Sequence, residues 1–500
     1  MISFDDRHGP ADAAPAEAYP DLTVPAWYRD AKLGLFVHWG LYSVPAWADV
    51  LDRSDVTSET AYARHQYAEW YANTVRIAGS PTRQRHERLY GVGHSYEDFA
   101  DDWHPSADAV PGIVELAGRA GARYVVPTTK HHDGFCLWDS ATTPFTTARR
   151  GPGRDLIAEF AAAVRAKGLR LGLYYSGAHD WHASEFPPLT SHHELFALRR
   201  NDQEFAAFAA AQLRELIDRF APDLLWNDID WPDAGKADGP DALQELFREH
   251  LAAVPDGLVN DRWGVPVRGV LTREYQEITE VQEEVFESTR GLGLSFGYNA
   301  DESAEHALDG TALIRLLADV VSKNGNLLIN VGPRADGSIP ELQRRALEEL
   351  GQWLGLHGAA IYGTRPWFHE AVRVPPEGVR FTLGPGAHRA DGPHGPDGAD
   401  GADAARGGGG VGGAVRTDEP ETLHVLLLDP AVGSVTLDEE VSAAIREVAQ
   451  VPGAGDGAGP SGTTGAEDAV PPGALDAGGR ITLTPEPGER AVSVVSLCLR

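Results

Sequence analysis

Residues 202–228, DQEFAAFAAAQLRELIDRFAPDLLWND, contain one complete helix-to-strand unit. Apolar side chains recur every three or four residues from Phe205 to Phe220, the spacing that buries one face of an α-helix. Pro222 ends this helix, and the short apolar run that follows it is typical of a buried strand. Helices and strands that alternate in this way favour a parallel sheet.

The same order occurs elsewhere in the chain. A helix that begins near Pro111 precedes a strand at 123–129, and a helix capped by Asp155 precedes a strand at 169–176. We expect further strands at 33–40, 258–263 and 326–333, and helices at 311–323 and 340–356. At least six strands predict an α/β fold with a closed (β/α)8-like barrel of the TIM type. An open doubly wound sheet is the alternative, although no GxGxxG follows any strand.

The distribution of tryptophan divides the chain into two parts. All 12 Trp residues lie between Trp27 and Trp367. We expect the barrel to span residues 25–366, after an N-terminal extension of residues 1–24. Residues 367–500 contain short β-rich runs with no helical pattern between them, which predicts a small C-terminal β-sandwich.

Two tracts interrupt the C-terminal region, at 384–414 and 452–479, and both are dominated by Gly, Ala, Asp and Pro. Their apolar content is too low to offset the entropy of ordering, so they are predicted to be disordered insertions. A separate carbohydrate-binding module is an alternative interpretation of this region. Its lack of Trp, a common platform for sugar stacking, favours a structural role.

The charge of the chain excludes several classes of partner. The 500 residues include 43 Lys and Arg against 74 Asp and Glu, a net charge of −31, which disfavours nucleic acid and anionic membranes. No apolar stretch reaches the length of about 18 residues that spans a membrane, and the N-terminus lacks an export signal, so we expect a cytoplasmic protein. Two cysteines are too few for a disulfide framework. The sequence leaves the oligomeric state open and allows a homo-oligomer.

Polar side chains stand at or just beyond the ends of five predicted strands. They are His38, the pair His131 and His132, Tyr174, Asp228 and Arg262. Barrel enzymes place their chemistry at the C-terminal ends of the strands. This recurrence therefore predicts an active site at that end of the barrel.

Strand alternation places Leu224, Trp226 and Asp228 on one face. If that face lines the barrel, a carboxylate beside an aromatic wall suits attack on the anomeric carbon of a sugar. The alternative is a surface aspartate that caps the next segment, a description that fits Asp230 in the following loop better.

His131 and His132 are adjacent, so their side chains project in opposite directions, and no HExxH or CxxC motif accompanies them. We therefore expect no metal site. Neutral imidazoles that hydrogen-bond to substrate hydroxyls fit this pattern better. His38 has the same interpretation, with a buried and hydrogen-bonded core histidine as the alternative.

Seven segments of the chain resemble the α-L-fucosidases of glycoside hydrolase family 29, in family order, and together span roughly Trp27 to Trp367. They are WYRDAKLGLFVHWGLYSVPAWA, RYVVPTTKHHDGFCLWDS, RLGLYYSGAHDW, PDLLWNDIDWP, VNDRWGVP, FESTRGLGLSFGYN and DVVSKNGNLLINVGPRADGSIP. The C-terminal region resembles the family only in being β-rich.

The resemblance implies that Asp228 is the catalytic nucleophile and that Glu287 is the general acid/base. Glu287 is preferred to Glu283 and Glu284 because it immediately precedes the well-matched STRGLGLSFGYN. The resemblance also implies a set of residues around the sugar ring: His38, Glu69, Trp70, His131, His132, Tyr174, Trp226 and Arg262. For Glu69 and Trp70 the alternative is a helix-face residue and a core aromatic.

A retaining exo-α-L-fucosidase is the implied activity. Such an enzyme removes terminal fucose from a fucosylated oligosaccharide or glycoconjugate through a covalent fucosyl-enzyme intermediate, without a metal ion or organic cofactor. Trp226, Phe36 and Phe296 are candidates for a recess that holds the sugar methyl group. A catalytically silent fucose-binding protein is the alternative, and the glycosidic linkage and natural glycan stay open.

Overall fold

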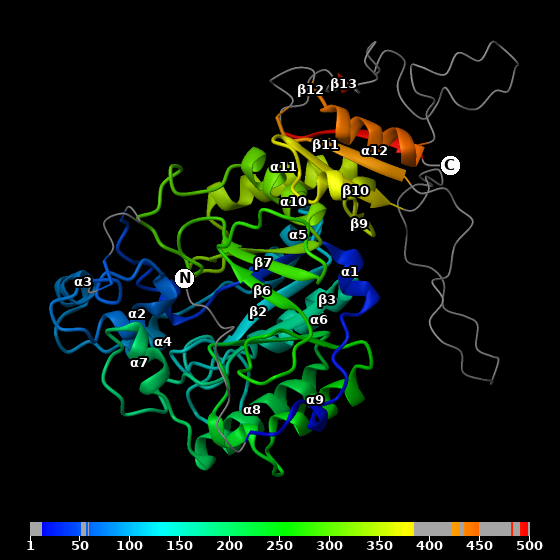
Figure 1. Ribbon diagram of the computed structural model, residues 1–500. Coiled ribbons are helices and arrows are strands. Elements are labelled where there is room, and N and C mark those ends of the chain that lie inside the picture. The colour runs from blue at the N-terminus through cyan, green and yellow to red at the C-terminus, as the bar shows by residue number, and fades with distance from the viewer. Residues whose placement is uncertain are drawn as a thin grey trace, which may run out of the picture.

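The computed structural model of the chain describes residues 13–51, 57–58, 60–384, 422–429, 435–449, 482–483 and 491–498. Eight parallel strands form one sheet in the order β5-β4-β3-β2-β1-β8-β7-β6. Their bounds are β1 Leu33–Val37, β2 Tyr124–Lys130, β3 Arg170–Ser176, β4 Leu224–Asp228, β5 Leu258–Val259, β6 Leu271–Glu274, β7 Phe286–Gly291 and β8 Gly325–Val331. A parallel bridge between Asn260 and Val270 joins the two edges of the sheet. The expected TIM-like barrel is confirmed (Figure 1).

Helices cover the outside of the barrel. The main ones are α5 Ala109–Arg119, α6 Leu156–Ala166, α8 Gln203–Phe220, α9 Leu243–Ala253, α10 Gly310–Ser322 and α11 Glu341–His357. Asp155 and Asp202 cap α6 and α8, and their side chains accept hydrogen bonds from the backbone N–H of Ala158 and Phe205. The apolar stripe of α8 that repeats every three or four residues is buried, as its spacing predicts.

Shorter helices connect these units. They are α1 Ala26–Ala31, α2 Tyr71–Thr74, α3 Pro81–Tyr90, α4 Phe99–Asp102 and α7 His192–Ala197. Figure 1 shows α2, α3, α4 and α7 gathered on one side of the molecule. In the described part of the chain, no helix combines the length and the apolar character needed to cross a bilayer.

Alternate side chains of the strands fill the inside of the barrel. Phe36, Tyr174, Leu224, Trp226 and Leu328 belong to one buried apolar cluster. Trp226 packs against Tyr174 with ring centroids 5.5 Å apart and an interplanar angle of 21°. The face on which the sequence places Trp226 and Asp228 is therefore the inner face of the barrel.

Strand β5 ends earlier than its sequence predicts. The side-chain amide of Asn260 accepts a hydrogen bond from the backbone N–H of Asn227 at 3.0 Å and donates one to the carbonyl of Asn227 at 2.8 Å. This side chain takes the place of the backbone ladder, so the strand is limited to Leu258–Val259. The residues that follow are then free to turn toward the end of the barrel.

A second sheet follows the barrel. Strands β9 Arg365–Pro366, β10 Val379–Gly384, β11 Thr422–Leu427 and β14 Ser493–Cys498 pair in the order β14-β11-β10-β9, and β12 Val435–Thr436 pairs with β13 Thr482–Leu483. The expected β-rich C-terminal region is confirmed. It also contains helix α12, Glu439–Ala449, which the strand pattern does not predict.

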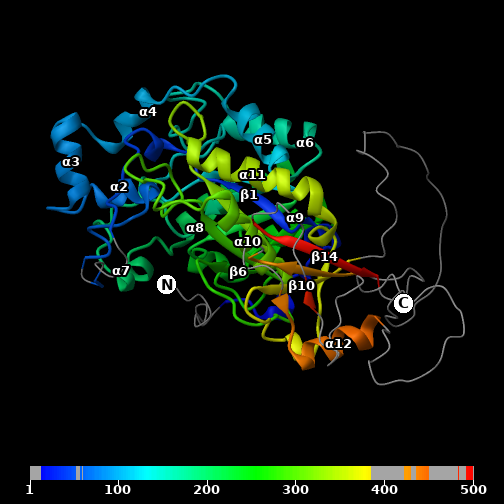
Figure 2. The ribbon, with the colours of Figure 1, turned by 90° about the horizontal axis from the view of Figure 1, so that it is seen from above.

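The second sheet packs on the barrel through α11. Trp353 of α11 donates a hydrogen bond from Nε1 to the carbonyl of Val492 at 2.8 Å, and Leu426 of β11 belongs to the main core. Figure 2 shows α11 and α10 beside β14, with α12 further out. The tracts predicted to be disordered, 384–414 and 452–479, lie outside the described residues except for Gly384, which ends β10.

Candidate active site

A pocket opens at the C-terminal ends of the barrel strands, with about 590 Å³ of empty space that is partly open to solvent. Nine of the ten candidate site residues line it: His38, Glu69, Trp70, His131, His132, Tyr174, Trp226, Asp228 and Arg262. Phe36 and Phe296, the candidates for an apolar recess, also line it. Glu287 does not.

Asp228, the last residue of β4, holds the central carboxylate of the pocket. Arg262 donates from Nη1 to Oδ1 at 2.9 Å, and the hydroxyl of Tyr174 donates to Oδ2 at 2.9 Å. Nε2 of His132 lies 3.7 Å from the same Oδ2. The side chain keeps 14% of its surface exposed, so the carboxylate is fixed in direction and still open to a ligand.

Arg262 links this carboxylate to a second one. Its Nη2 donates to Oε2 of Glu274 at 2.9 Å, and its Nε donates to Oγ1 of Thr272 at 2.9 Å. The guanidinium carbon lies 4.7 Å from the centre of the Trp226 ring. Three nitrogens of the guanidinium donate hydrogen bonds and one face of it lies over Trp226. Arg262 thus holds Asp228 at Nη1 and Glu274 at Nη2 of one planar group.

The histidines of the pocket are neutral because burial lowers the pKa of His38 to about 4 and the pKa values of His131 and His132 well below their ordinary value. Ser176 uses its hydroxyl hydrogen on the carbonyl of His179, so it accepts a hydrogen bond from Nδ1 of His132 at 2.6 Å. Nε2 of His132 therefore carries a lone pair. This nitrogen can accept a hydrogen bond from a sugar hydroxyl.

The same tautomer is imposed on His38. Asn330 donates from Nδ2 to the carbonyl of Phe296 at 2.7 Å, which fixes its Oδ1 as the acceptor for Nδ1 of His38 at 2.7 Å. Nε2 of His38 is then an acceptor as well. Two imidazole nitrogens of the pocket thus suit hydroxyl groups rather than anions.

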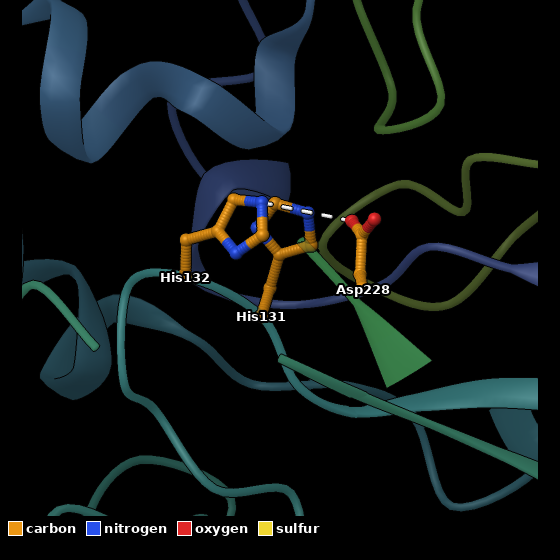
Figure 3. Close-up of side chains that lie close together, drawn as sticks. All are labelled: His131, His132 and Asp228. Carbon is orange, nitrogen blue, oxygen red and sulfur yellow. Dashed lines mark ion pairs between the residues drawn. The ribbon is translucent and has the colours of Figure 1, made fainter. Parts of the chain in front are cut away.

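His131, His132 and Asp228 also stand close enough to hold a metal ion, with one ligand atom from each within 4.8 Å of the others (Figure 3). Neutral imidazoles and a carboxylate are ligands for zinc or copper. However, both oxygens of Asp228 already accept hydrogen bonds, and the positive charge of Arg262 at 2.9 Å would repel a cation. The donor set fits sugar hydroxyls better than a metal ion.

Glu69 and Trp70 belong to the pocket wall. Both lie in a single 3-10 turn, Ala68–Trp70, and Glu69 is 2% exposed. Oε2 of Glu69 accepts hydrogen bonds from the N–H of Gly297 at 2.7 Å and the hydroxyl of Ser295 at 3.1 Å. Trp70 stacks on His65 with centroids 4.5 Å apart. Neither residue lies on an exposed helix face.

Burial raises the pKa of Glu69 to about 7. In an unfolded chain the pKa of a glutamate is about 4.3. Between this pH and the pKa of Glu69, the folded state binds a proton that the unfolded state has lost, so the free energy of unfolding falls as pH rises. In the wild type, Glu69 should lower the free energy of unfolding by roughly 3 kcal/mol between pH 4 and 8. Glu69→Gln should lack this decline. Denaturant titrations at several pH values measure this, with the exposed Glu284→Gln as control. Equal pH slopes in wild type and Glu69→Gln would contradict the expectation.

Glu287, the expected general acid/base, lies outside the pocket lining. It is the second residue of β7, paired in register with Thr272, and its side chain points into the closed interior of the barrel, where it is 0% exposed. It accepts hydrogen bonds from the hydroxyls of Tyr28 and Tyr124 at 2.6 and 2.8 Å and from Nε1 of Trp226 at 2.8 Å. A general acid must reach the departing oxygen, and this carboxyl is sealed from it.

Glu274 is a pocket carboxylate that the sequence analysis did not identify. It is the last residue of β6, lines the pocket, and keeps 29% of its side chain exposed. Glu274 fits the same sequence pattern as Asp228, because each is a polar residue at the end of a strand. The four-residue strand LTRE is too short and too little apolar for its pattern to be recognised. Glu283 and Glu284, the other candidates, line a separate cavity that also includes Leu271 and Arg373.

Comparison with known proteins points to one family. A family model described as alpha-L-fucosidase matches residues 12–359. The alpha-L-fucosidase of Dictyostelium discoideum is 32% identical over 354 residues, 69% of this chain and 72% of that protein. A solved alpha-L-fucosidase structure is 44% identical and covers 73% of this chain and 84% of its own, with a TM-score of 0.67. The crystal structure of Thermotoga maritima alpha-fucosidase is 34% identical and covers 95% of this chain and 97% of its own, with a TM-score of 0.71.

The family model spans all eight barrel strands, and both solved structures are similar to the chain in fold. The chain therefore belongs to the α-L-fucosidase family of glycoside hydrolases.

Proposed function

We propose that the chain is a retaining exo-α-L-fucosidase that uses Asp228 as nucleophile and Glu274 as general acid/base. The observation that carries this proposal is the single guanidinium of Arg262, which hydrogen-bonds to both carboxylates at 2.9 Å. Retaining glycosidases hold their two carboxyl groups about 5 to 5.5 Å apart. One planar cation cannot bridge carboxylates that lie far apart, so the arrangement favours the short separation.

In the first step Oδ2 or Oδ1 of Asp228 attacks the anomeric carbon and forms an ester bond as the bond to the leaving oxygen breaks. Glu274 gives its proton to that oxygen, so the aglycone departs as a neutral alcohol. In the second step Glu274 withdraws a proton from water, and the water oxygen displaces Asp228 from the anomeric carbon. The two inversions restore the original configuration and return both carboxyl groups to their starting protonation states.

The remaining pocket residues fit the shape of fucose. The acceptor nitrogens of His38 and His132 suit ring hydroxyls, and the aromatic rings of Phe36, Phe296 and Trp226 suit the 6-methyl group. Phe36 and Trp226 are buried in the inner apolar cluster of the barrel, have ring centroids 5.0 Å apart and line the pocket, so they would close its inner end. A closed end admits only a terminal sugar, which supports the exo mode and a fucosylated glycan or glycoside as substrate.

Proton NMR of the first sugar released from 4-nitrophenyl α-L-fucoside tests this proposal. We expect α-L-fucose to appear before mutarotation produces the β anomer. The matched α-L-galactoside, which adds one hydroxyl to the methyl group, should react about 10 to 200 times more slowly in kcat/KM. Release of β-L-fucose first would contradict retention, and binding of fucose without turnover would instead support a catalytically silent protein.

A further inference from the structure

The backbone directly after Asp228 adopts an unusual conformation. Ile229 has φ of 50° and Asp230 has φ of 78°, so two consecutive residues other than glycine lie in the left-handed region. A β-branched residue is strongly disfavoured there. Such a turn persists only where its surroundings hold it in place, and such strain clusters at functional sites.

A buried ionic cluster holds this turn. The carboxylate of Asp230 is 3% exposed and accepts from Nη1 of Arg199 at 2.6 Å through Oδ2 and from Nζ of Lys236 at 2.8 Å through Oδ1. Both cations also contact Asp233. Arg199 follows α7 and Lys236 ends the 3-10 turn Asp233–Lys236, so the cluster ties the turn to two other segments. Asp230 is not the exposed capping residue that its place in a loop suggests.

The turn also forms hydrogen bonds with Asn227, which precedes Asp228, and with the backbone of Arg262. The backbone N–H of Asp230 donates to the carbonyl of Arg262 at 3.0 Å. Nδ2 of Asn227 donates to the carbonyl of Asp230 at 2.9 Å and to that of Arg262 at 2.8 Å. The cluster therefore fixes the backbone on both sides of Asp228 and the backbone of its cationic partner.

Two glycines make room for Asp230. A Cβ on Gly264 would lie 1.8 Å from Oδ1 of Asp230, and a Cβ on Gly177 would lie 2.4 Å from its carbonyl oxygen. Gly177 follows β3 and Gly264 lies in the loop after β5, so three strand ends converge on this one residue. No larger residue could stand at either position without displacing the turn.

We propose that Asp230 is a positioning residue, whose carboxylate, clamped between Arg199 and Lys236, maintains the left-handed turn that aims Asp228 at the anomeric carbon. The inference rests on the proposed role of Asp228 as nucleophile. Asp230 does not line the pocket, so it acts through the position of Asp228 rather than on the sugar.

Asp230→Asn is the first test. Asparagine has nearly the same shape and tolerates a positive φ, so this change isolates the charge of the carboxylate. We expect kcat for an aryl α-L-fucoside to fall roughly 10- to 100-fold with KM changed much less, because a displaced reacting group costs rate rather than binding. If Asp230→Asn does not fold, Lys236→Met, which removes one of the two cations, should show the same pattern with a smaller loss.

Asp319→Asn is the matched control. Asp319 also lies between one lysine and one arginine, at 2.7 Å from Nζ of Lys323 and 2.5 Å from Nε of Arg380, but it belongs to α10 on the outside of the barrel. Its loss should lower Tm without changing kcat or KM. If Asp230→Asn or Lys236→Met likewise lowers only Tm, the positioning role is wrong.

A double substitution separates the inference from the proposed function. In Asp228→Gly, azide attacks the sugar in place of the missing carboxylate, so aiming that carboxylate no longer matters. Adding Asp230→Asn to this variant should then change the azide-dependent rate by about twofold or less. An equal loss in both backgrounds would overturn the positioning role. No azide-dependent turnover in Asp228→Gly would instead contradict the proposed nucleophile.

Discussion

Replacing Asp228 by glycine is expected to lower kcat for 4-nitrophenyl α-L-fucoside by about 10⁴-fold or more, the loss typical of a residue that reacts in the rate-limiting step. The reason is that Asp228 itself would form the ester bond, and the other two carboxyl groups that line the described pocket, Glu69 and Glu274, are held by Gly297 and Arg262. Azide should restore turnover and produce a fucosyl azide of inverted configuration. Steady-state kinetics with and without azide measure both effects.

Asp223→Asn provides the control for this variant. Asp223 immediately precedes the same strand, β4, and pairs with Arg170 at 2.6 Å at the opposite end of the barrel. Its loss should affect stability and leave turnover close to that of the wild type. Undiminished kcat in Asp228→Gly would show that another group is the nucleophile.

Replacing Glu274 by glutamine has the second largest expected effect, and the loss depends on the leaving group. For natural fucosyl linkages, whose alcohols leave only when protonated, kcat/KM should fall by about 10² to 10⁴-fold. For 2,4-dinitrophenyl α-L-fucoside the departure needs little proton assistance, so the first step should be nearly unaffected. A series of aryl fucosides of graded leaving-group pKa measures this dependence.

Glu287→Gln is the matched control for Glu274. Its carboxyl accepts three buried hydrogen bonds, so the substitution leaves at least one donor poorly matched and should lower Tm. Its rates on good and poor leaving groups should change by the same factor. A leaving-group dependence in Glu287→Gln that is absent in Glu274→Gln would reverse the assignment.

The barrel could be predicted because its units are local. The periodicity of α8, the caps Asp155 and Asp202, and the apolar runs of β2, β3 and β4 each depend on neighbouring residues. The amphipathic helix α12 was missed, because the region around it consists of β-rich runs and glycine tracts. Its buried face, which includes Val441 and Ile445, packs with Phe381 and Val425 of the second sheet.

A pocket residue could be identified from the sequence where it stands at the end of a strand that the sequence pattern reveals. His38 and Asp228 satisfy that condition, and Tyr174 lies two residues before the end of β3, whereas Glu274 ends a strand of only four residues. The burial of Glu287 could not be predicted, because the sequence does not give the height of a residue within the barrel. The register that pairs Glu287 with Thr272 puts it below the pocket, two residues before the level of Glu274.

Asp230 could not be interpreted from sequence for a different reason. Its partners Arg199 and Lys236 are distant in the chain or across a turn, and the space around it depends on Gly177 and Gly264. A charged residue in a loop is usually exposed, and only the fold reveals that this one is buried and paired.

The most direct test of the central claim is to trap the intermediate with 2-deoxy-2-fluoro-L-fucosyl fluoride. The fluorine at C2 slows both steps and the fluoride leaves readily, so the fucosyl-enzyme should accumulate. Peptide mass spectrometry of the inactivated protein should find one fluorofucosyl ester, on Asp228. A label on Glu274, Glu287 or any other residue, or inactivation without a covalent label, would contradict the account.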